Sequence, residues 1–383
     1  MISRDSSKQL KAISASFKAI AITGPRQSGK TTLTKSFFPT KPYVTLENPT
    51  DRNLALADPV SFLKAFPEGA ILDEVQKAPE LFSYLQGILD ASDEKGKFIL
   101  TGSNNFLLLE SISQSLAGRV GYLDLLPFSI HESEICPKPP SSLEESIFLG
   151  GYPSVVHDRT TPEDWFASYV RTYVERDVRL VKNIADLVTF QRFLYLCAGR
   201  IGQQINLTNL ANDVGVDHKT VQSWLGVLQA SYITYSLPPY YKNFNKRLTK
   251  TSKLYFYDTG LACYLLGIKN STELVNHGYR GPLFENFIIT ELTKNRYNQG
   301  KRSNLFYWRD SSGNEIDVLI DEGSIQIPVE IKSAATLNMD FFKGLHYWEK
   351  LTGQKGGHLV FTGESTRIHK DFIVNNWRDV KDL

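Results

Sequence analysis

A segment near the amino end, GPRQSGKTT, has the residue types and spacing of a phosphate-binding loop. It follows the apolar run AIAIT and leads into TLTKSFF, which is competent to form a helix. In such a loop the backbone N–H groups turn inward around phosphate oxygens, and the positive N-terminal end of the next helix faces the same anion. We therefore expect a nucleoside triphosphate, ATP or GTP, to be held by Gly24, Pro25, Arg26, Gln27, Ser28, Gly29, Lys30, Thr31 and Thr32.

Two side chains of this loop and an acidic pair further along predict catalysis. Lys30 would reach the β- and γ-phosphates, and the Thr31 hydroxyl would ligate Mg²⁺. The apolar run GAILDE ends in Asp73 and Glu74, and nucleotides bind at the carboxyl ends of strands in open α/β sheets. Asp73 would then hold the Mg²⁺ shell, and Glu74 would polarise the attacking water. Nucleotide binding alone would not need Glu74, so hydrolysis is implied.

Polar residues after a later strand, and an arginine beyond it, leave two interpretations open. Ser103 and Asn104 end the strand KFILTGS and could orient water or sense the γ-phosphate, although polar residues at a strand end also form turns. Arg119 stands just before the run VGYLDLL. It could stabilise the charge on the transferred phosphoryl group of a neighbouring subunit, or it could form a surface ion pair.

A second set of charged residues lies in the last third of the chain. Asp317 is inside the apolar run GNEIDVLIDEG, and Glu330 and Lys332 share one face of the strand IQIPVEIK. Two carboxylates and a lysine on adjacent strands predict a Mg²⁺ site, in which the metal activates water and Lys332 stabilises charge on a phosphate. Glu285, in the helical segment GPLFENFIITELTKN, is a third potential ligand. The alternative is a strand edge joined by ion pairs.

Alternating strands and helices must position the first set. From Ile2 to about Pro127, apolar runs alternate with amphipathic segments, which predicts an α/β fold with a parallel sheet covered by helices on both faces. The expected strands are AIAIT, PYVTLEN, GAILDE, KFILTGS and VGYLDLL. Their carboxyl ends would bring the loop, the acidic pair and the polar pair to one edge.

The middle of the chain has the pattern of a DNA-binding module. The run INLTNLANDVGVDHKTVQSWLGVLQASYIT predicts two helices around a turn at Gly215, with Asp217 capping the second helix, and two strands around a basic loop follow, as in a winged helix. Residues 188–253 carry eight Lys or Arg against two Asp or Glu, a balance of +6 that leaves −4 for the rest. Winged helices also serve as dimerisation or lid modules. The residues expected at DNA are His218, Lys219, Gln222, Lys242, Lys246, Arg247 and Lys250.

Length and composition fit a folded protein of two or three domains. The 383 residues are 42% hydrophobic and 22% charged. The N-terminus MISRDSSKQLK lacks the apolar segment of a secretory signal, and no later stretch has the length of a membrane span. Cys136, Cys197 and Cys263 are odd in number and far apart, so neither a disulfide framework nor a thiolate metal site is expected. These features predict a cytoplasmic protein with no membrane partner.

With these residues in place, the chain resembles the prokaryotic AAA-type ATPases that carry a winged helix and a C-terminal restriction-endonuclease-like domain. The resemblance extends over nearly the full length and rests on GPRQSGKTTL, ILDEVQKAPEL, ILTGSNN, SLAGRV, LLPFS, GGYPSVV, YVERDV, YFYDTGL, FENFI, YWRD and NEIDVLI with VEIK. It implies a Walker A loop at Gly24 to Thr32, a Walker B pair at Asp73 and Glu74, a first sensor at Ser103 or Asn104, and an arginine finger at Arg119. Glu285, Asp317, Glu330 and Lys332 map onto the PD-(D/E)xK nuclease core, in which Ile316 replaces the usual proline.

We accordingly expect four parts: an AAA-type P-loop ATPase domain (1–135), a helical lid (136–187), a winged helix (188–260) and a nuclease-like α/β domain (261–383). The leading hypothesis is a homo-oligomer, such as a hexamer, that hydrolyses ATP with Mg²⁺ and acts on DNA, which the C-terminal domain cuts. The alternative is a nucleotide-controlled switch or defence sensor whose nuclease-like domain is a non-catalytic docking surface. Remodelling of a protein partner ranks lowest, because no substrate pore motif stands out.

Overall fold

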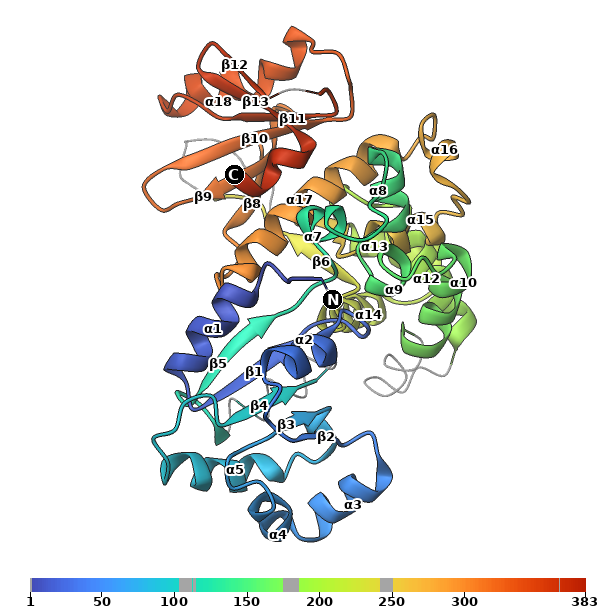
Figure 1. Cartoon of the computed structure of the whole chain (residues 1–383). Helices are drawn as coiled ribbons and strands as arrows, with labels where there is room; N and C mark the ends of the chain where they lie inside the picture. Colours follow the sequence, from blue (N-terminus) through green and yellow to red (C-terminus); the bar gives the residue numbers. More distant parts are fainter. Residues whose placement is uncertain (1, 103–111, 113–114, 175–185, 242–250, 365) are drawn as a thin grey trace. The chain divides into compact units, whose positions relative to one another are not determined.

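The computed structural model describes residues 2–102, 112, 115–174, 186–241, 251–364 and 366–383 (Figure 1). The chain forms two compact units. Unit 1 consists of residues 1–128 with two later insertions, Ala230–Tyr232 and Tyr297–Lys301, and unit 2 consists of Ser129–Gln229, Ile233–Arg296 and Arg302–Leu383. The boundaries expected at 135, 187 and 260 stay predictions. In the described part of the chain, no helix has both the length and the apolarity needed to cross a membrane.

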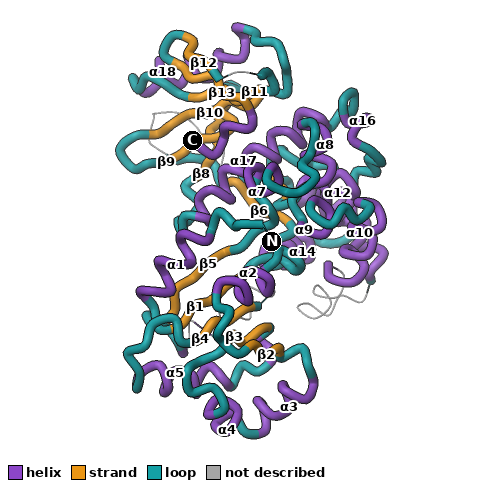
Figure 2. Tube along the Cα trace, viewed as in Figure 1, coloured by secondary structure: helices purple, strands orange, loops and turns teal. Residues whose placement is uncertain are grey.

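Unit 1 is built on a five-stranded sheet with the order β2-β3-β4-β1-β5 (Figure 2). Its strands are β1 (Ala19–Thr23), β2 (Tyr43–Thr45), β3 (Ile71–Asp73), β4 (Phe98–Thr101) and β5 (Val120–Asp124). Every neighbouring pair is parallel, so the predicted parallel sheet is confirmed. Because β4 lies between β1 and β3, the carboxyl ends of these three strands meet at one edge.

Helices cover both faces of this sheet, because its strands are apolar on both sides. They are α1 (Ser7–Ser16), α2 (Lys30–Phe37), α3 (Pro49–Ala57), α4 (Pro59–Lys64) and α5 (Leu81–Asp90), with the short 3₁₀ helix η1 (Val75–Lys77). Ala21 of β1 belongs to one apolar cluster with Leu85 of α5. The next residue, Ile22, belongs to another with Leu10 of α1 and Leu33 of α2. Alternation along β1 therefore assigns each helix to its face.

Unit 2 begins with helices and one hairpin. The helices are α7 (Ile130–Glu134), α8 (Leu143–Leu149), α9 (Pro153–Val156), α10 (Pro162–Tyr169), the π-helix η2 (Val170–Val174), α12 (Leu187–Ala198), α13 (Leu207–Val214), α14 (His218–Ala230), α15 (Thr259–Leu265) and α16 (Ser271–Leu274), and the antiparallel hairpin is β6 (Thr234–Leu237) with β7 (Lys253–Phe256). Gly215, with a φ of 88°, ends α13. The Asp217 carboxylate then accepts hydrogen bonds from the backbone N–H groups of Lys219 and Thr220 at the start of α14. The ring of Trp224 in α14 lies 5.3 Å from that of Phe190 in α12.

A buried carboxylate explains two of the sequence motifs. Asp258, in YFYDTGL, accepts the N–H of Leu261 at 2.9 Å and thereby caps α15. It also accepts the N–H of Gly151, in GGYPSVV, at 2.7 Å. A Cβ at Gly150 would lie 2.3 Å from Asp258 Oδ1, so only glycine leaves room for the carboxylate. These motifs therefore have a packing role within unit 2.

The carboxyl-terminal part of unit 2 is a mixed six-stranded sheet with the order β12-β13-β11-β10-β9-β8. Its strands are β8 (Leu305–Arg309), β9 (Glu315–Asp321), β10 (Gln326–Lys332), β11 (His358–Phe361), β12 (Arg367–His369) and β13 (Phe372–Asn376). The long helix α17 (Arg280–Asn298) precedes the sheet, and η3 (Met339–Phe342), α18 (Lys343–Thr352) and η4 (Trp377–Asp382) accompany it. Trp308, Phe342 and Trp348 lie in one buried cluster that forms its core.

Candidate functional site

The phosphate-binding loop has the backbone shape that its glycines predict. Gly24 (φ 144) and Gly29 (φ 93) both have positive φ, a region in which a side chain is strained. A Cβ at position 24 would lie 2.2 Å from the carbonyl oxygen of Leu125, the residue after β5. Glycine at this position therefore lets the loop pass directly over the end of the neighbouring strand.

Two basic side chains hold this loop, Arg4 from before it in the chain and Lys30 from its end. Lys30 is the first residue of α2 and is buried, and its Nζ donates to the carbonyl oxygens of the first two loop residues at 2.9 and 2.7 Å. The Arg4 guanidinium donates to the carbonyl oxygen of Ser28 at 2.8 Å and to that of Leu126 at 2.7 Å. The loop is thus tied to its own lysine and to the segment after β5.

Asp73 is the centre of a set of hydroxyl contacts at the carboxyl edge of the sheet. Thr31 Oγ1 donates to Asp73 Oδ2 at 3.0 Å, and the Tyr43 hydroxyl donates to the same oxygen at 2.6 Å. Thr101, the last residue of β4, donates to Asp73 Oδ1. Burial and the neighbouring carboxylate raise the pKa of Tyr43, so its hydroxyl stays a donor. The structure thus brings together Thr31 and Asp73, the two residues that the sequence predicts as magnesium ligands.

The oxygens around Asp73 fit a hard divalent cation. Mg²⁺ in proteins is usually bound by one or two carboxylates together with substrate phosphates and water. Thr31, in the first turn of α2, supplies a hydroxyl, and Asp73, at the end of β3, supplies a carboxylate. These two residues would hold the ion, and Tyr43 and Thr101 would orient the carboxylate.

Glu74 follows Asp73 in an uncommon backbone conformation. Its φ is 55, in the left-handed region that non-glycine residues rarely adopt. Residues held there often belong to functional sites, because the surrounding structure must impose the conformation. The Glu74 side chain is buried and accepts a hydrogen bond from the Gln76 amide. Its place beside Asp73 suits a residue that orients water at the same edge.

The other residues predicted at the nucleotide have different placements. Ser103 and Asn104 lie outside the described residues. Arg119 forms a two-pronged ion pair with Asp90, in which Nε lies 2.5 Å from Oδ1 and Nη2 lies 2.9 Å from Oδ2. This bond holds the pKa of Asp90 below its usual range. The ion pair is one of the two interpretations of Arg119, and its action on a neighbouring subunit stays a prediction.

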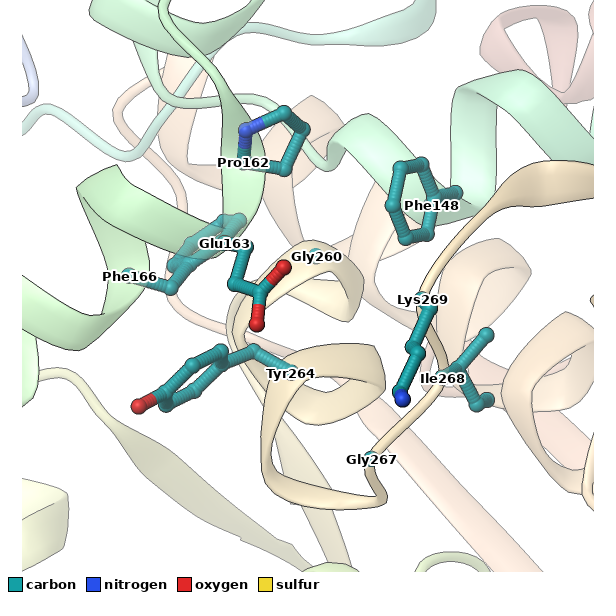
Figure 3. A pocket seen from close by; sticks show the side chains of 9 residues that line it. All are labelled: Phe148, Pro162, Glu163, Phe166, Gly260, Tyr264, Gly267, Ile268 and Lys269. Atoms are coloured by element: carbon teal, nitrogen blue, oxygen red, sulfur yellow. The ribbon is translucent and has the colours of Figure 1, made fainter.

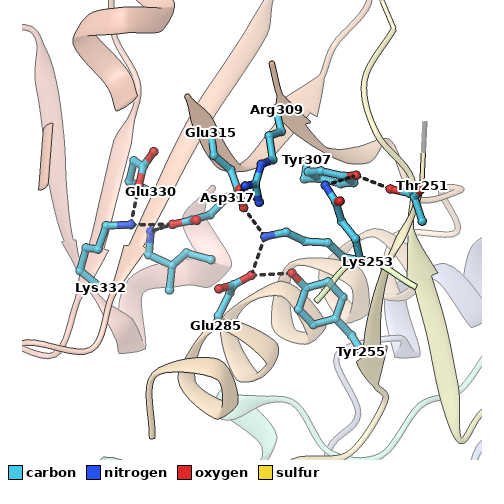
Figure 4. A network of polar contacts seen from close by, with 12 residues as sticks. Thr251, Lys253, Tyr255, Glu285, Tyr307, Arg309, Glu315, Asp317, Glu330 and Lys332 are labelled. Carbon is cyan, nitrogen blue, oxygen red and sulfur yellow. Dashed lines mark hydrogen bonds and ion pairs between the residues drawn. The ribbon is translucent and has the colours of Figure 1, made fainter. Parts of the chain in front are cut away.

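A second group of charged residues, here named the acidic cluster, lies in unit 2 (Figure 4) and consists of Glu285, Glu315, Asp317, Glu330, Lys253 and Lys332. Lys332 Nζ lies 3.0 Å from Asp317 Oδ2 and 2.6 Å from Glu330 Oε2. Asp317 Oδ2 also accepts the backbone N–H of Ile331 at 2.8 Å. The pairing of β9 with β10 therefore brings together the three residues that the sequence assigns to a metal site.

Lys253 connects the β6–β7 hairpin to the acidic cluster. It is the first residue of β7, and its side chain is only 5% exposed. Its Nζ lies 3.2 Å from Glu285 Oε1 and 2.5 Å from Glu315 Oε1. The Tyr255 hydroxyl, on the same strand, also donates to Glu285 (Figure 4). Glu285 of α17 is thus held by two residues of β7.

The ion pairs set the direction of each pKa in the acidic cluster. Burial alone would raise the pKa of Asp317, but Lys332 and Lys253 reverse this and lower it. Burial and the charge of Asp317 raise the pKa of Glu330 well above its usual range, because Lys332 offsets only part of their effect. The cluster therefore combines a carboxyl that ionises readily with one that resists ionisation.

The acidic cluster does not fit a magnesium ion in this arrangement. Among the residues that the structure describes, no three His, Cys, Asp or Glu side chains form a group that could hold a metal. Lys332 lies against Asp317 and Glu330, and a Cβ on Gly344 of α18 would lie 2.1 Å from Glu330 Oε1. The oxygens have the right chemistry, but a cation would have to displace an ammonium group to reach them.

The residues predicted to contact DNA are only partly described. His218, Lys219 and Gln222 are exposed along one side of α14, whereas Val221 and Trp224 are buried. Lys242, Lys246, Arg247 and Lys250 lie outside the described residues, between β6 and β7. The helices α13 and α14 and the strands β6 and β7 follow one another in the predicted order, whereas the winged helix and its contact with DNA stay predictions.

A small pocket in the helical part of unit 2 contains none of the predicted site residues (Figure 3). The rings of Phe148, Phe166 and Tyr264 line it, together with the exposed side chains of Glu163 and Lys269. Its two charged side chains are exposed to solvent, and we assign the pocket no role.

Several residues at these sites were missed from sequence, among them Tyr43, Thr101, Lys253 and Glu315. Tyr43 and Thr101 lie on strands of the predicted parallel sheet, so the rule that places ligands at carboxyl ends could have found Thr101. Lys253 carried a weaker signal. A lysine in a buried strand needs a partner charge, but that partner, Glu285, is 32 residues away.

Family models match three consecutive segments of the chain. Residues 16–134 match an AAA domain. Residues 140–272 match a domain of unknown function (DUF8612), and residues 280–378 match another domain of unknown function (DUF4143). The first segment contains the phosphate-binding loop with Asp73 and Glu74, and the third contains all four carboxylates of the acidic cluster.

Relatives are similar over much of the chain but are themselves uncharacterised. An uncharacterised protein of Mycobacterium tuberculosis is 29% identical over 338 residues, which cover 87% of this chain and 74% of that protein. One from Haemophilus influenzae is 24% identical over 215 residues, 52% of this chain and 51% of that protein. The solved Walker-type ATPase of Pyrococcus abyssi is 17% identical, and the match covers 69% of this chain and 96% of that chain at a TM-score of 0.42. The AAA match, the parallel sheet and the loop geometry together support an AAA-type P-loop domain in residues 16–134.

Proposed function

We propose that this protein binds ATP together with Mg²⁺ and hydrolyses it in unit 1. The observation that carries the proposal is the contact between Thr31 Oγ1 and Asp73 Oδ2 at 3.0 Å. A hydroxyl from the helix that follows a phosphate-binding loop and a carboxylate from the end of a neighbouring strand are the protein ligands that a magnesium–nucleotide complex needs. The AAA domain match of residues 16–134 supports the same assignment.

Each residue of the site has its own task in this proposal. The N–H groups of residues 24–29 and the N-terminus of α2 bind the phosphates, and Lys30 offsets the charge that develops on the γ-phosphoryl group. Glu74 orients the attacking water and accepts its proton. Thr31 and Asp73 hold Mg²⁺. When bound, the ion withdraws charge from the phosphate oxygens.

DNA is the partner that we propose for α13 and α14. Support comes from the exposed side of α14, with His218, Lys219 and Gln222, and from the +6 balance of residues 188–253. Arg119 would act on a neighbouring subunit's nucleotide, which requires a homo-oligomer and release of Asp90. The cytoplasm is the proposed compartment, because all three cysteines are free and buried.

A second candidate function is favoured by the acidic cluster. Lys253 and Lys332 already neutralise its carboxylates, which supports a structural cluster more than a nuclease centre. In this alternative the protein is a nucleotide-controlled switch or sensor, in which ATP turnover determines how long a conformational state lasts. The C-terminal domain is then a non-catalytic docking surface. DNA cleavage by Asp317, Glu330 and Lys332 remains part of the first hypothesis.

Hydrolysis is tested by phosphate release from ATP with the purified chain. Glu74→Gln should retain nucleotide binding in calorimetry and lose most hydrolysis, because the water loses its base while the loop is untouched. Glu80→Gln is the matched control, since Glu80 is exposed six residues further on. Full hydrolysis by Glu74→Gln would refute the role of this residue.

Cleavage and switching are separated by a plasmid-nicking assay run beside the ATPase assay. Nicking with Mg²⁺ that Lys332→Ala abolishes would support a nuclease. Nicking that survives Lys332→Ala would show that the acidic cluster does not catalyse the cleavage. Intact ATP hydrolysis with neither nicking nor stimulation by DNA would favour the switch.

A further inference from the structure

A buried tyrosine from outside the matched AAA segment reaches the base of the phosphate-binding loop. Tyr232 lies two residues beyond the end of α14 and is only 4% exposed. Together with Ala230 and Ser231 it belongs to unit 1, whereas the residues immediately before and after belong to unit 2. The chain therefore enters unit 1 for three residues, and Tyr232 is the large side chain among them.

The Tyr232 hydroxyl contacts both strands that anchor the loop. It donates to Asp124 Oδ1 and lies 3.0 Å from Thr23 Oγ1, which itself donates to Asp124 Oδ1 at 2.6 Å. Thr23 ends β1 and directly precedes Gly24, and it pairs with Asp124 at the end of β5. One phenol thus closes a hydrogen-bonded group one residue away from the phosphate-binding loop.

The local backbone would favour glycine where Tyr232 stands. The N–H of Ile233 donates to the carbonyl oxygen of Leu228 at 2.9 Å, the bond of a Schellman helix end. In this motif the residue before the donor is left-handed, and Tyr232 has φ 56. Glycine is the usual occupant, because a Cβ is strained there. A bulky aromatic residue in this conformation must be held by its contacts, and those contacts are at the loop's base.

We propose that Tyr232 is a positioning residue that couples occupancy of the phosphate-binding loop to the C-terminal end of α14. Its hydroxyl is bound at the base of the loop, and its backbone is the turn that ends α14, so one residue belongs to both elements. A nucleotide that stiffens the loop stiffens this turn as well, and the turn biases nucleotide binding in return. The inference rests on the proposed nucleotide binding, and it needs neither DNA binding nor cleavage.

The test is amide hydrogen exchange of the full chain with and without a slowly hydrolysed ATP analogue and Mg²⁺. In the unaltered protein the analogue should slow exchange both in residues 24–31 and in residues 228–233. Tyr232→Phe keeps the ring and removes the hydroxyl, so protection of 24–31 should remain while that of 228–233 is lost. Tyr235→Phe is the matched control, because the Tyr235 hydroxyl contacts Thr290 at 3.0 Å within unit 2. It should behave like the unaltered protein.

Calorimetry with the same analogue gives the reciprocal measurement. Tyr232→Phe should weaken its binding about 5-fold, at the low end of typical coupling between sites. Asp124→Asn alters the same hydrogen bond from the other side, and the double variant should bind no more weakly than the weaker single variant. Asp124→Asn alone serves as the test if Tyr232→Phe folds poorly.

The outcomes separate this inference from the proposed function. Binding of the analogue with equal protection of residues 228–233 in the unaltered protein and Tyr232→Phe would overturn the coupling alone. Binding without any protection of 228–233 in the unaltered protein would do the same. No binding to any of the proteins would overturn the proposed ATPase, and the coupling with it.

Discussion

Unit 1 and unit 2 each have buried carboxylates on strands, Asp73 in unit 1 and those of the acidic cluster in unit 2. The groups that contact these carboxylates differ in charge between the two units. Asp73 accepts hydrogen bonds from three hydroxyls, those of Thr31, Tyr43 and Thr101. Asp317 lies instead against the ammonium group of Lys332. The charge of a carboxylate held by neutral donors remains available to a cation. The charge of a carboxylate paired with lysine is already balanced by the ammonium group.

An acidic residue in a strand does not by itself indicate a metal site. Both sets satisfy the same sequence pattern of carboxylates in apolar strands. What distinguishes them is the neighbour that the fold brings to each carboxylate. In unit 1 that neighbour is a hydroxyl from the helix after the loop, and in unit 2 it is a lysine from β7 or β10.

The largest expected effect is a loss of stability in unit 2. Lys253→Met would leave Glu285 and Glu315 without their buried counter-charge, and breaking a buried pair by removing one partner costs about 3–5 kcal/mol. Lys343→Met is the control, because its pair with Asp340 is exposed and should contribute only about 0–1 kcal/mol. Urea unfolding followed by tryptophan fluorescence measures both. Equal small losses would mean that the ion pairs of the cluster are not what holds it.

A large effect on rate is expected at the loop. Lys30→Ala removes the cation beside the phosphates and should lower ATP hydrolysis by about 100-fold, the typical loss of one group that stabilises transition-state charge. Lys35→Ala changes an exposed lysine later in α2 and should leave the rate nearly unchanged. Phosphate release at saturating ATP gives both rates. Similar hydrolysis rates for the two variants would mean that Lys30 of the loop does not take part in hydrolysis.

The smallest effect concerns pH. The folded-state pKa of Glu330 is raised above its ordinary value of 4.5 by burial and by Asp317, so the folded protein binds this proton more tightly than the unfolded chain. Its contribution to stability is therefore full below that ordinary value and declines as the pH rises through the folded-state pKa. Glu330→Gln cannot ionise and should lose this decline at pH values above the ordinary value of 4.5, as measured by urea unfolding. The same pH slope in both proteins would contradict the assigned pKa direction.

The loop and its sheet could be predicted because their determinants are close together in the sequence. Gly24 and Gly29 set the backbone of the loop locally, and the strand and helix beside it are continuous with it. The meeting of Thr31 with Asp73 needed only the rule that parallel strands end at one edge. The parallel sheet followed from the alternation of apolar runs with amphipathic helices.

The remaining contacts depend on packing between distant segments. Arg119 meets Asp90 across 29 residues, Lys253 meets Glu285 across 32, and Tyr232 meets Asp124 across 108. No local pattern states whether a buried carboxylate will face a metal, a lysine or a hydroxyl. The sequence therefore identified Asp73, Asp317 and Glu330 but could not identify the partners that decide their chemistry.

The most direct test of the account is calorimetric titration of the chain with an ATP analogue, with and without Mg²⁺. Mg²⁺ should tighten binding to the unaltered protein and have little effect on Asp73→Asn, which keeps the shape of the side chain but loses its charge. Absence of binding heat from ATP, GTP and their analogues, or equal tightening by Mg²⁺ in both proteins, would contradict it.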